Sequence, residues 1–292
     1  MSRVVVTGAG GMLGRAVLEE IAGSVGFTHQ QLDVCDERAV RSALQRERPH
    51  WVVHCAAYTN VDAAESEPEV ANRVNGEGAG IVARAAAEVG AGIVYISSDY
   101  VFDGSKRSPY VEDDPTNPIS AYGRSKLAGE RAVSESNNNH LIVRTAWLFG
   151  PYGRNFVETI LALARERESL LVVHDQVGCP TYTRHLAAAI AALLESPARG
   201  VHHVAGGGAC SWFEFASEAV QLAGIECAVE PCTTDQFPRP AARPANSVLR
   251  ATREQTPRLP HWRTGLRAYL AERGLLASRR EDDVVPPEVK TG

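Results

Sequence analysis

The chain has 292 residues, of which 44% are hydrophobic and 22% are charged, as is ordinary for a globular protein that buries a substantial core. Its formal net charge is −5 and its Lys and Arg residues are scattered, which argues against binding of nucleic acid. No apolar run reaches the roughly 20 residues that span a bilayer, and residues 1–11 lack the pattern of a signal peptide, so we expect a cytoplasmic protein without membrane contact.

Short apolar runs alternate with longer helical patterns in the first half of the chain. The runs at residues 4–6, 51–55, 93–96 and 141–144 predict strands, and the patterns at 12–22, 71–88 and 121–134 predict helices. Such alternation is typical of βαβ units, so we predict an α/β fold built on a Rossmann-like, doubly wound parallel sheet. Residues 1–149 would form this dinucleotide-binding domain.

The alternation weakens after residue 150. Helices are predicted at residues 155–168, 183–194 and 211–223, the last of them capped by Ser211. Strands are predicted at 170–173 and 201–204, and an irregular, proline-rich loop at 237–244. We therefore predict that residues 150–277 mainly form a smaller, partly interwoven C-terminal domain that binds the substrate, with segments near 170–205 returning to the first domain. The charged residues 278–292 are expected to be a disordered tail.

A glycine turn joins the first predicted strand to the first predicted helix. Gly8, Gly11 and Gly14 have the GxxGxxG spacing that provides a tight turn, a close approach of the backbone to a pyrophosphate, and close packing of the helix on the strand. The helix N-terminus would add free N–H groups and the positive end of a dipole. In this context the turn predicts a dinucleotide site.

Two interpretations of Asp33 stay open. It lies at about the distance from the turn, roughly 20 residues, that is expected of an acid that binds the adenosine ribose. It is equally suited to cap a helix before Glu37. The second strand is expected to end near residues 27–29, which hold no acid and leave room for a 2′-phosphate, so the cofactor is either NADPH or NADH.

Tyr122 and Lys126 form a YxxxK pair on a predicted helix, where residues four apart share one face. A lysine ammonium beside a tyrosine hydroxyl stabilises the phenolate and lowers the tyrosine pKa from about 10. Such a tyrosine can donate a proton to the alkoxide that forms when hydride reaches a carbonyl carbon. Ser98 ends a predicted parallel strand, where its hydroxyl would point into the ligand crevice and polarise that carbonyl.

The glycine turn, the strand-end serine and the YxxxK pair together resemble the extended short-chain dehydrogenase/reductase superfamily. Five further stretches, spread in order between residues 3 and 275, resemble the dTDP-4-dehydrorhamnose reductase family within it: residues 56–65, 98–104, 144–147, 175–181 and 243–247. The resemblance implies an oxidoreductase that uses NADPH or NADH to reduce the C4 keto group of a dTDP-keto-deoxysugar, dTDP-4-dehydro-L-rhamnose.

The resemblance also implies roles for individual residues. Tyr122 would donate the proton, Lys126 would lower its pKa and bind the nicotinamide ribose, and Ser98 stands where the family usually has threonine. The other cofactor contacts would come from Gly8, Gly11, Met12, Leu13, Asp33, Val34, Ala57, Tyr58 and Thr59. Contacts to the sugar and its diphosphate would come from Ser98, Asp99, Tyr100, Trp147 and Arg243. A core position for Trp147 and a surface ion pair for Arg243 are the alternatives.

Two related chemistries are disfavoured. Nucleotide-sugar 4,6-dehydratases place an Asp-Glu pair after the strand-end hydroxyl, whereas Asp99 is followed here by Tyr100. Some relatives form a dimer bridged by Mg²⁺ through a carboxylate early in the first helix, where this chain has Arg15 and Ala16. The six cysteines contain no CxxC pair, so we predict no metal site and reduced cysteines in the core. Both a monomer and a homodimer stay open.

Two alternatives to the leading function also stay open. A reductase of another dTDP-deoxysugar, as in antibiotic pathways, would share the same reacting residues. A catalytically silent relative, the regulatory subunit of methionine adenosyltransferase, keeps the fold and can keep affinity for the cofactor. The intact Tyr122, Lys126 and Ser98 count against this second alternative.

Overall fold

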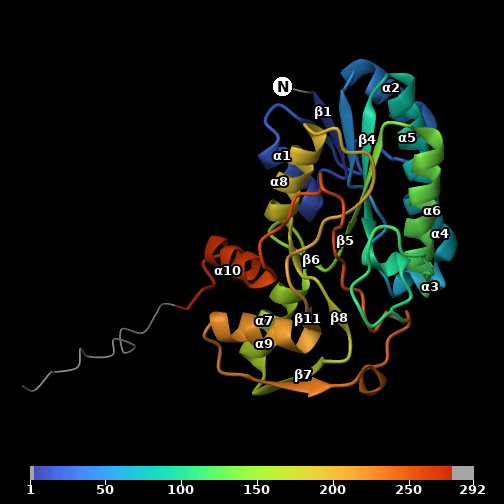
Figure 1. The fold of residues 1–292 in the computed structure, drawn as a ribbon. Helices are drawn as coiled ribbons and strands as arrows, with labels where there is room; N and C mark the ends of the chain where they lie inside the picture. Colours follow the sequence, from blue (N-terminus) through green and yellow to red (C-terminus); the bar gives the residue numbers. More distant parts are fainter. Residues whose placement is uncertain (1–2, 278–292) are drawn as a thin grey trace, which may run out of the picture.

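The computed structural model describes residues 3–277, and a six-stranded parallel sheet forms its centre (Figure 1). The strands lie in the order β10-β5-β4-β3-β1-β2. Their bounds are Val4–Thr7 (β1), Val25–Phe27 (β2), Trp51–His54 (β3), Gly92–Ser98 (β4), His140–Thr145 (β5) and Gly200–His203 (β10). The chain proceeds from β1 to β2 in one direction and from β3 to β4 in the other, so the carboxyl ends of β1 and β3 border the crevice in which such sheets bind ligands.

Helices cover both faces of this sheet. One face is covered by α1 (Met12–Glu20) and α8 (Thr183–Leu194), and the other by α2 (Glu37–Glu47), α5 (Ala79–Glu88) and α6 (Ala121–Ser136) (Figure 1). Successive side chains of a strand point to opposite faces, so Val4 and Val6 pack in one apolar cluster and Val5 in the other. The predicted α/β fold with a Rossmann-like, doubly wound parallel sheet is confirmed.

The prediction of one continuous helix over residues 71–88 is wrong. After the short helix α3 (Ala63–Ser66), α4 (Pro68–Asn72) passes into a π-helical turn, η1 (Arg73–Gly78), before α5 begins. The wider turn carries Asn75, whose buried side chain bonds to groups on two other segments instead of following the helical pattern. Such π turns are often found at functional sites.

A smaller lobe lies beyond the carboxyl ends of the central strands (Figure 1). Its apolar core unites α7 (Phe156–Glu166), α9 (Trp212–Leu222) and α10 (Trp262–Glu272), and Ser211 caps α9 as its place in the sequence predicts. Three strand pairs complete it: β6 (Leu148–Phe149) with β9 (Thr181–Tyr182), β7 (Ser169–Val173) with β12 (Ala228–Cys232), and β8 (Val177–Gly178) with β11 (Cys210–Ser211).

The segments predicted to return to the first domain near 170–205 behave in two ways. β10 joins the large sheet, and α8 packs against that sheet. β7 does not join it, because β7 pairs with β12 and packs on the core of the smaller lobe. The domain division at residue 150 stays a prediction, and the predicted tail 278–292 lies outside the described residues. Among residues 3–277, no helix has the length and apolar composition needed to cross a membrane.

A buried ion pair ties α6 to β5 beneath the end of β4. Glu130 Oε2 lies 2.7 Å from Arg144 Nη2, Glu130 Oε1 accepts from Arg144 Nε at 2.8 Å, and both side chains are almost fully buried. Ser97 on β4 donates a further hydrogen bond to Glu130 Oε1. Because removing a carboxylate from water is costly, these partners compensate for the burial of the Glu130 side chain.

We expect Arg144→Leu to lower the free energy of unfolding by about 3–5 kcal/mol, because Glu130 would be left without its buried counter-ion. Urea unfolding followed by circular dichroism measures this change. The control is Arg41→Leu, which removes an exposed pair with Glu88 and should move the midpoint far less. Equal shifts for the two variants would contradict the prediction.

Candidate active site

A cavity of about 930 Å³ opens at the carboxyl ends of β1, β3 and β4. Its lining brings together most of the residues predicted to bind the cofactor or to react: Gly8, Gly11, Met12, Leu13, Asp33, Val34, Ala57, Tyr58, Thr59, Tyr122, Lys126 and Trp147. Four predicted residues lie outside this lining, namely Ser98, Asp99, Tyr100 and Arg243. In the described part of the chain, no group of three or more His, Cys, Asp or Glu side chains is arranged to hold a metal ion.

Gly8 makes the tight part of the turn between β1 and α1. Its φ is +68°, and a Cβ atom there would lie 2.5 Å from the backbone nitrogen of Ala56, so only glycine fits. α1 begins at Met12, directly after Gly11, which as N-cap offers no side chain to the helix. The first N–H groups of α1 therefore lack intrahelical acceptors and border the cavity. This cradle fits the pyrophosphate of a dinucleotide.

Asp33 lines the cavity with an exposed side chain, and the alternative that it caps the next helix is wrong. The cap of α2 is Asp36, which accepts from Ala39 N, whereas Asp33 Oδ1 accepts from Cys35 N at 2.9 Å within its own loop. β2 ends at Phe27, so no carboxylate stands directly at the strand end, as predicted. The structure therefore does not distinguish NADPH from NADH at this point.

Asn75 fixes the loop that carries Tyr58. Its Oδ1 accepts from Tyr58 N at 2.8 Å, and its Nδ2 donates to Tyr58 O at 3.0 Å and to Ser125 Oγ at 2.9 Å. Ser125 directly precedes Lys126, so one amide joins the cofactor-side loop to the helix of the YxxxK pair. The sequence interpretation missed Asn75, and its only signal is a polar residue within an alanine-rich helical pattern.

Tyr122 lies in the first turn of α6, which Ser120 caps by accepting from Gly123 N at 3.1 Å. Burial raises the pKa of Tyr122 to about 12; the nearby Asp99 acts in the same direction, and the Ser98 hydroxyl acts against it. The Tyr100 ring meets the Tyr122 ring edge-on, with 5.7 Å between centroids. Tyr122 is therefore protonated at neutral pH and available as an acid.

Lys126 is buried one turn further along α6. Burial lowers the pKa of Lys126 to about 7, while Glu130 opposes this shift. Its Nζ lies over the ring of Tyr95, 4.2 Å from the centroid. The role of Lys126 in lowering the pKa of Tyr122 stays a prediction; in this structure the ammonium lies over the Tyr95 ring.

Ser98 and Asp99 form the far side of the site, where β4 passes into the short helix η2 (Asp99–Val101). The Ser98 hydroxyl donates to Asp99 Oδ1 at 2.9 Å and accepts from Tyr100 N at 3.1 Å. Burial raises the pKa of Asp99 to about 6, although the Ser247 and Ser98 hydroxyls act in the opposite direction. The carboxyl group is thus charged at neutral pH, yet shielded from water.

Trp147 and Arg243 each have a protein partner. Trp147 has a φ of +48°, lines the cavity, and stacks on Trp212 with ring centroids 3.4 Å apart. A tryptophan keeps this left-handed conformation only where its surroundings hold it, as this stacking does. Arg243 Nη1 lies 3.0 Å from Asp62 Oδ1 and donates to Ala241 O at 2.8 Å. Arg243 therefore forms an ion pair, which is the alternative considered for it.

We expect Gly123→Ala to lower kcat by at least about tenfold, because small displacements of reacting groups are costly. A Cβ atom at Gly123 would overlap the carbonyl oxygen of Tyr100, so α6 would shift and carry Tyr122 with it. Steady-state kinetics on the folded variant measure the effect. Ser134→Ala, near the other end of the same helix, is the control and should keep wild-type kcat. A Gly123→Ala variant with wild-type kcat would show that this close approach is dispensable.

Comparison with known proteins gives consistent results. A family model described as RmlD substrate binding domain matches residues 2–274. A dTDP-4-dehydrorhamnose reductase of Streptomyces griseus is 44% identical over 278 residues, covering 90% of this chain and 91% of the relative. A dTDP-4-keto-6-deoxy-D-glucose reductase of Streptomyces niveus is 41% identical over 274 residues, covering 90% of this chain and 95% of the relative.

The fold also has close counterparts among solved structures. A crystal structure of dTDP-4-dehydrorhamnose reductase from Bacillus anthracis in complex with NADP has a TM-score of 0.91 to this chain at 42% identity. The match covers 93% of this chain and 99% of the other. The similarity therefore extends over both the large sheet and the smaller lobe.

Proposed function

We propose that this chain, which belongs to the dTDP-4-dehydrorhamnose reductase family, uses NADPH or NADH to reduce the C4 keto group of dTDP-4-dehydro-L-rhamnose to dTDP-L-rhamnose. One observation carries the proposal. Tyr122 and Lys126 line the same cavity as the glycine turn. A proton donor and a dinucleotide cradle thus face one space, as a carbonyl reduction requires.

The residues divide the work of reduction between them. The cofactor, held by the turn at Gly8 and the start of α1, would supply the hydride to C4. Tyr122, which burial keeps protonated, donates its proton to the carbonyl oxygen as that oxygen gains negative charge. Ser98 donates a hydrogen bond to the same oxygen and stabilises the charge. Lys126 binds the nicotinamide ribose, and its ammonium form adds a positive charge to the site.

Asp99 and Tyr100 support reduction over dehydration. A 4,6-dehydratase needs a second carboxylate to move a proton at the sugar, whereas Tyr100 follows Asp99 here, and its hydroxyl pKa is raised by burial. Asp99, Tyr100 and Trp147 would instead bind the sugar, and Arg243 would exchange its ion pair with Asp62 for the substrate diphosphate.

A second candidate is reduction of another dTDP-keto-deoxysugar. The relative from Streptomyces niveus, whose name gives a D-glucose-derived keto sugar, is about as similar as the relative from Streptomyces griseus. Identity of this size does not separate the two sugars, because reduction of either keto group needs the same transfer of a hydride and a proton. The outcome depends on loops around the sugar, such as residues 103–117 and those after Pro151.

The decisive experiment is oxidation of NADPH or NADH, followed at 340 nm, after addition of the keto sugar made in situ from dTDP-glucose by a 4,6-dehydratase and a 3,5-epimerase. We expect turnover and dTDP-L-rhamnose as the product identified by NMR. A different stereoisomer would favour the second candidate. Tight NADPH binding without turnover on either keto sugar would indicate a silent relative and contradict the proposal.

We expect Tyr122→Phe to lower kcat by at least about 100-fold, the low end of the effect of losing a general acid. Only the hydroxyl is removed, so NADPH affinity, measured by fluorescence titration, should stay close to that of the wild type. Tyr152→Phe, a change of the same kind at an exposed tyrosine, is the control. A near-normal rate for Tyr122→Phe would exclude this residue as the proton donor.

A further inference from the structure

Tyr95, on β4, is a buried tyrosine that the proposed reaction does not use. Its side chain is 0% exposed. The Tyr95 hydroxyl donates to Asn75 O on η1 at 2.9 Å and lies 3.3 Å from Lys126 O on α6. Burial raises the pKa of this hydroxyl well above its ordinary value, so the side chain is neutral.

Two close contacts fix the Tyr95 ring. A Cβ atom at Gly129 would overlap both the Tyr95 hydroxyl and the Asn75 carbonyl oxygen, so a larger residue on α6 would exclude the tyrosine from this place. The His54 ring at the end of β3 stacks on the Tyr95 ring, with 5.9 Å between centroids and 20° between planes. The ring therefore has a defined position beneath the active site.

The Lys126 ammonium lies over this ring. Lys126 is 2% exposed, yet among residues 3–277 its Nζ forms neither an ion pair nor a hydrogen bond with another residue. Nζ lies 4.2 Å from the centroid of the Tyr95 ring, a distance at which the negative face of an aromatic ring attracts a cation. Lys126 also lines the cavity, and an ammonium has three N–H donors to offer there.

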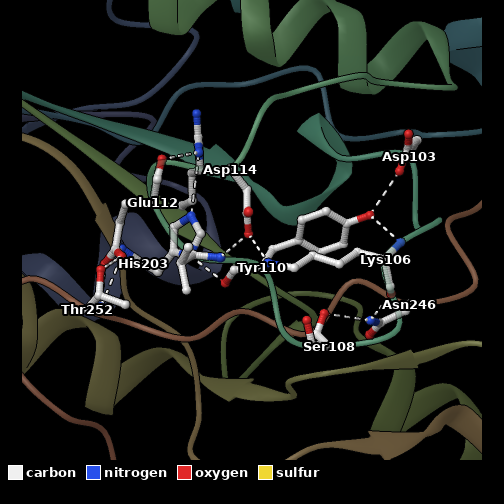
Figure 2. Close-up of polar contacts among 11 residues, drawn as sticks. Asp103, Lys106, Ser108, Tyr110, Glu112, Asp114, His203, Asn246 and Thr252 are labelled. Atoms are coloured by element: carbon white, nitrogen blue, oxygen red, sulfur yellow. Dashed lines mark hydrogen bonds and ion pairs between the residues drawn. The ribbon is translucent and has the colours of Figure 1, made fainter.

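Glu130, one turn further along α6, already has another partner. Its Oε2 lies 2.7 Å from Arg144 Nη2. Arg144 is held from its other side too, where Nη1 donates to Glu112 O at 3.4 Å and lies 3.5 Å from His203 Nε2. Figure 2 shows Glu112 and His203 next to each other. Glu130 therefore acts on Lys126 from a distance, without forming an ion pair with it.

We propose that Tyr95 is a positioning residue for Lys126, whose ammonium its ring holds in the charged form at the wall of the cavity, with the N–H donors free for the ribose of the cofactor. The inference rests on the proposed function, in which Lys126 binds that ribose. It explains how a buried lysine without a carboxylate partner keeps its charge, because the ring face replaces part of the lost hydration.

The ionisable groups around Lys126 allow its titration to be followed separately. Burial lowers the pKa of His54 to about 3 and raises the pKa of Cys55 and of Tyr122 to about 12. Burial also lowers the pKa of Lys126 to about 7, and Glu130 opposes this shift. Of His54, Cys55, Tyr122 and Lys126, only the lysine therefore changes charge between about pH 5 and pH 9.

The experiment is an NMR titration of the full chain without cofactor. The sequence has three lysines, Lys106, Lys126 and Lys290, so isotope labelling at lysine Cε gives few resonances, which Lys106→Arg and Lys290→Arg assign. Because the ring favours the ammonium form, Tyr95→Leu should lower the midpoint of Lys126 by about one pH unit. Tyr95→Phe, which keeps the ring and loses only the hydroxyl, is the matched control and should keep the wild-type midpoint.

Two outcomes would overturn the proposal. One is a wild-type midpoint in folded Tyr95→Leu. The other is an equal lowering in Tyr95→Phe and Tyr95→Leu, which would assign the effect to the hydroxyl. If the leucine variant does not fold, a trifluorinated phenylalanine at position 95 keeps the shape of the ring and removes the negative charge of its face, and the same lowering is expected.

Kinetics give a second readout. A shift of one pH unit leaves about a tenth of Lys126 charged at pH 7. Tyr95→Leu should therefore lower kcat/KM for NADPH about fivefold at pH 7 and less than about twofold at pH 6. An equal loss at both pH values would indicate a displaced helix and contradict the proposal. A wild type without turnover would contradict the proposed function, whereas the NMR titration needs no substrate and tests Tyr95 by itself.

Discussion

The close approach of α6 to the end of β4 is the constraint on which the rest of the active site depends. At Gly123 the helix lies so near the Tyr100 carbonyl that no side chain fits between them. That contact helps to place Tyr122, and Lys126 one turn further along α6, in the lining of the cavity. A glycine inside a helix lowers the stability of that helix by about 1 kcal/mol relative to alanine. At this position it allows the close approach on which the active site depends.

Positive and negative side chains alternate beneath the active site. Lys126, Glu130 and Arg144 are all buried. The Glu130 carboxylate pairs directly with Arg144 and opposes the lowering of the Lys126 pKa. In such a dry environment each charge acts strongly on its neighbours. The same ion pair that fastens α6 to β5 therefore also sets how readily Lys126 is protonated, so stability and chemistry share one set of residues.

The sequence predicted what depends on local pattern. The strand-glycine-helix turn, the YxxxK spacing and the Ser211 cap are all written within a few residues. It did not predict what depends on distant partners: Asn75 is defined by its bonds to Tyr58 and Ser125, and the direction of the Lys126 ammonium by the Tyr95 ring. The helix α10 was not predicted, although Trp262, Leu266 and Tyr269 have helical spacing.

The place of β10 has a consequence for how the protein is made. This strand covers the edge of β5, yet it is synthesised only after the whole of α7 and most of the short strands of the smaller lobe. Until then β5 is an open edge, the kind of surface on which nascent chains pair wrongly. The large sheet therefore cannot close until a large part of the smaller lobe has been synthesised, although α9 and α10, which complete the core of that lobe, follow later still.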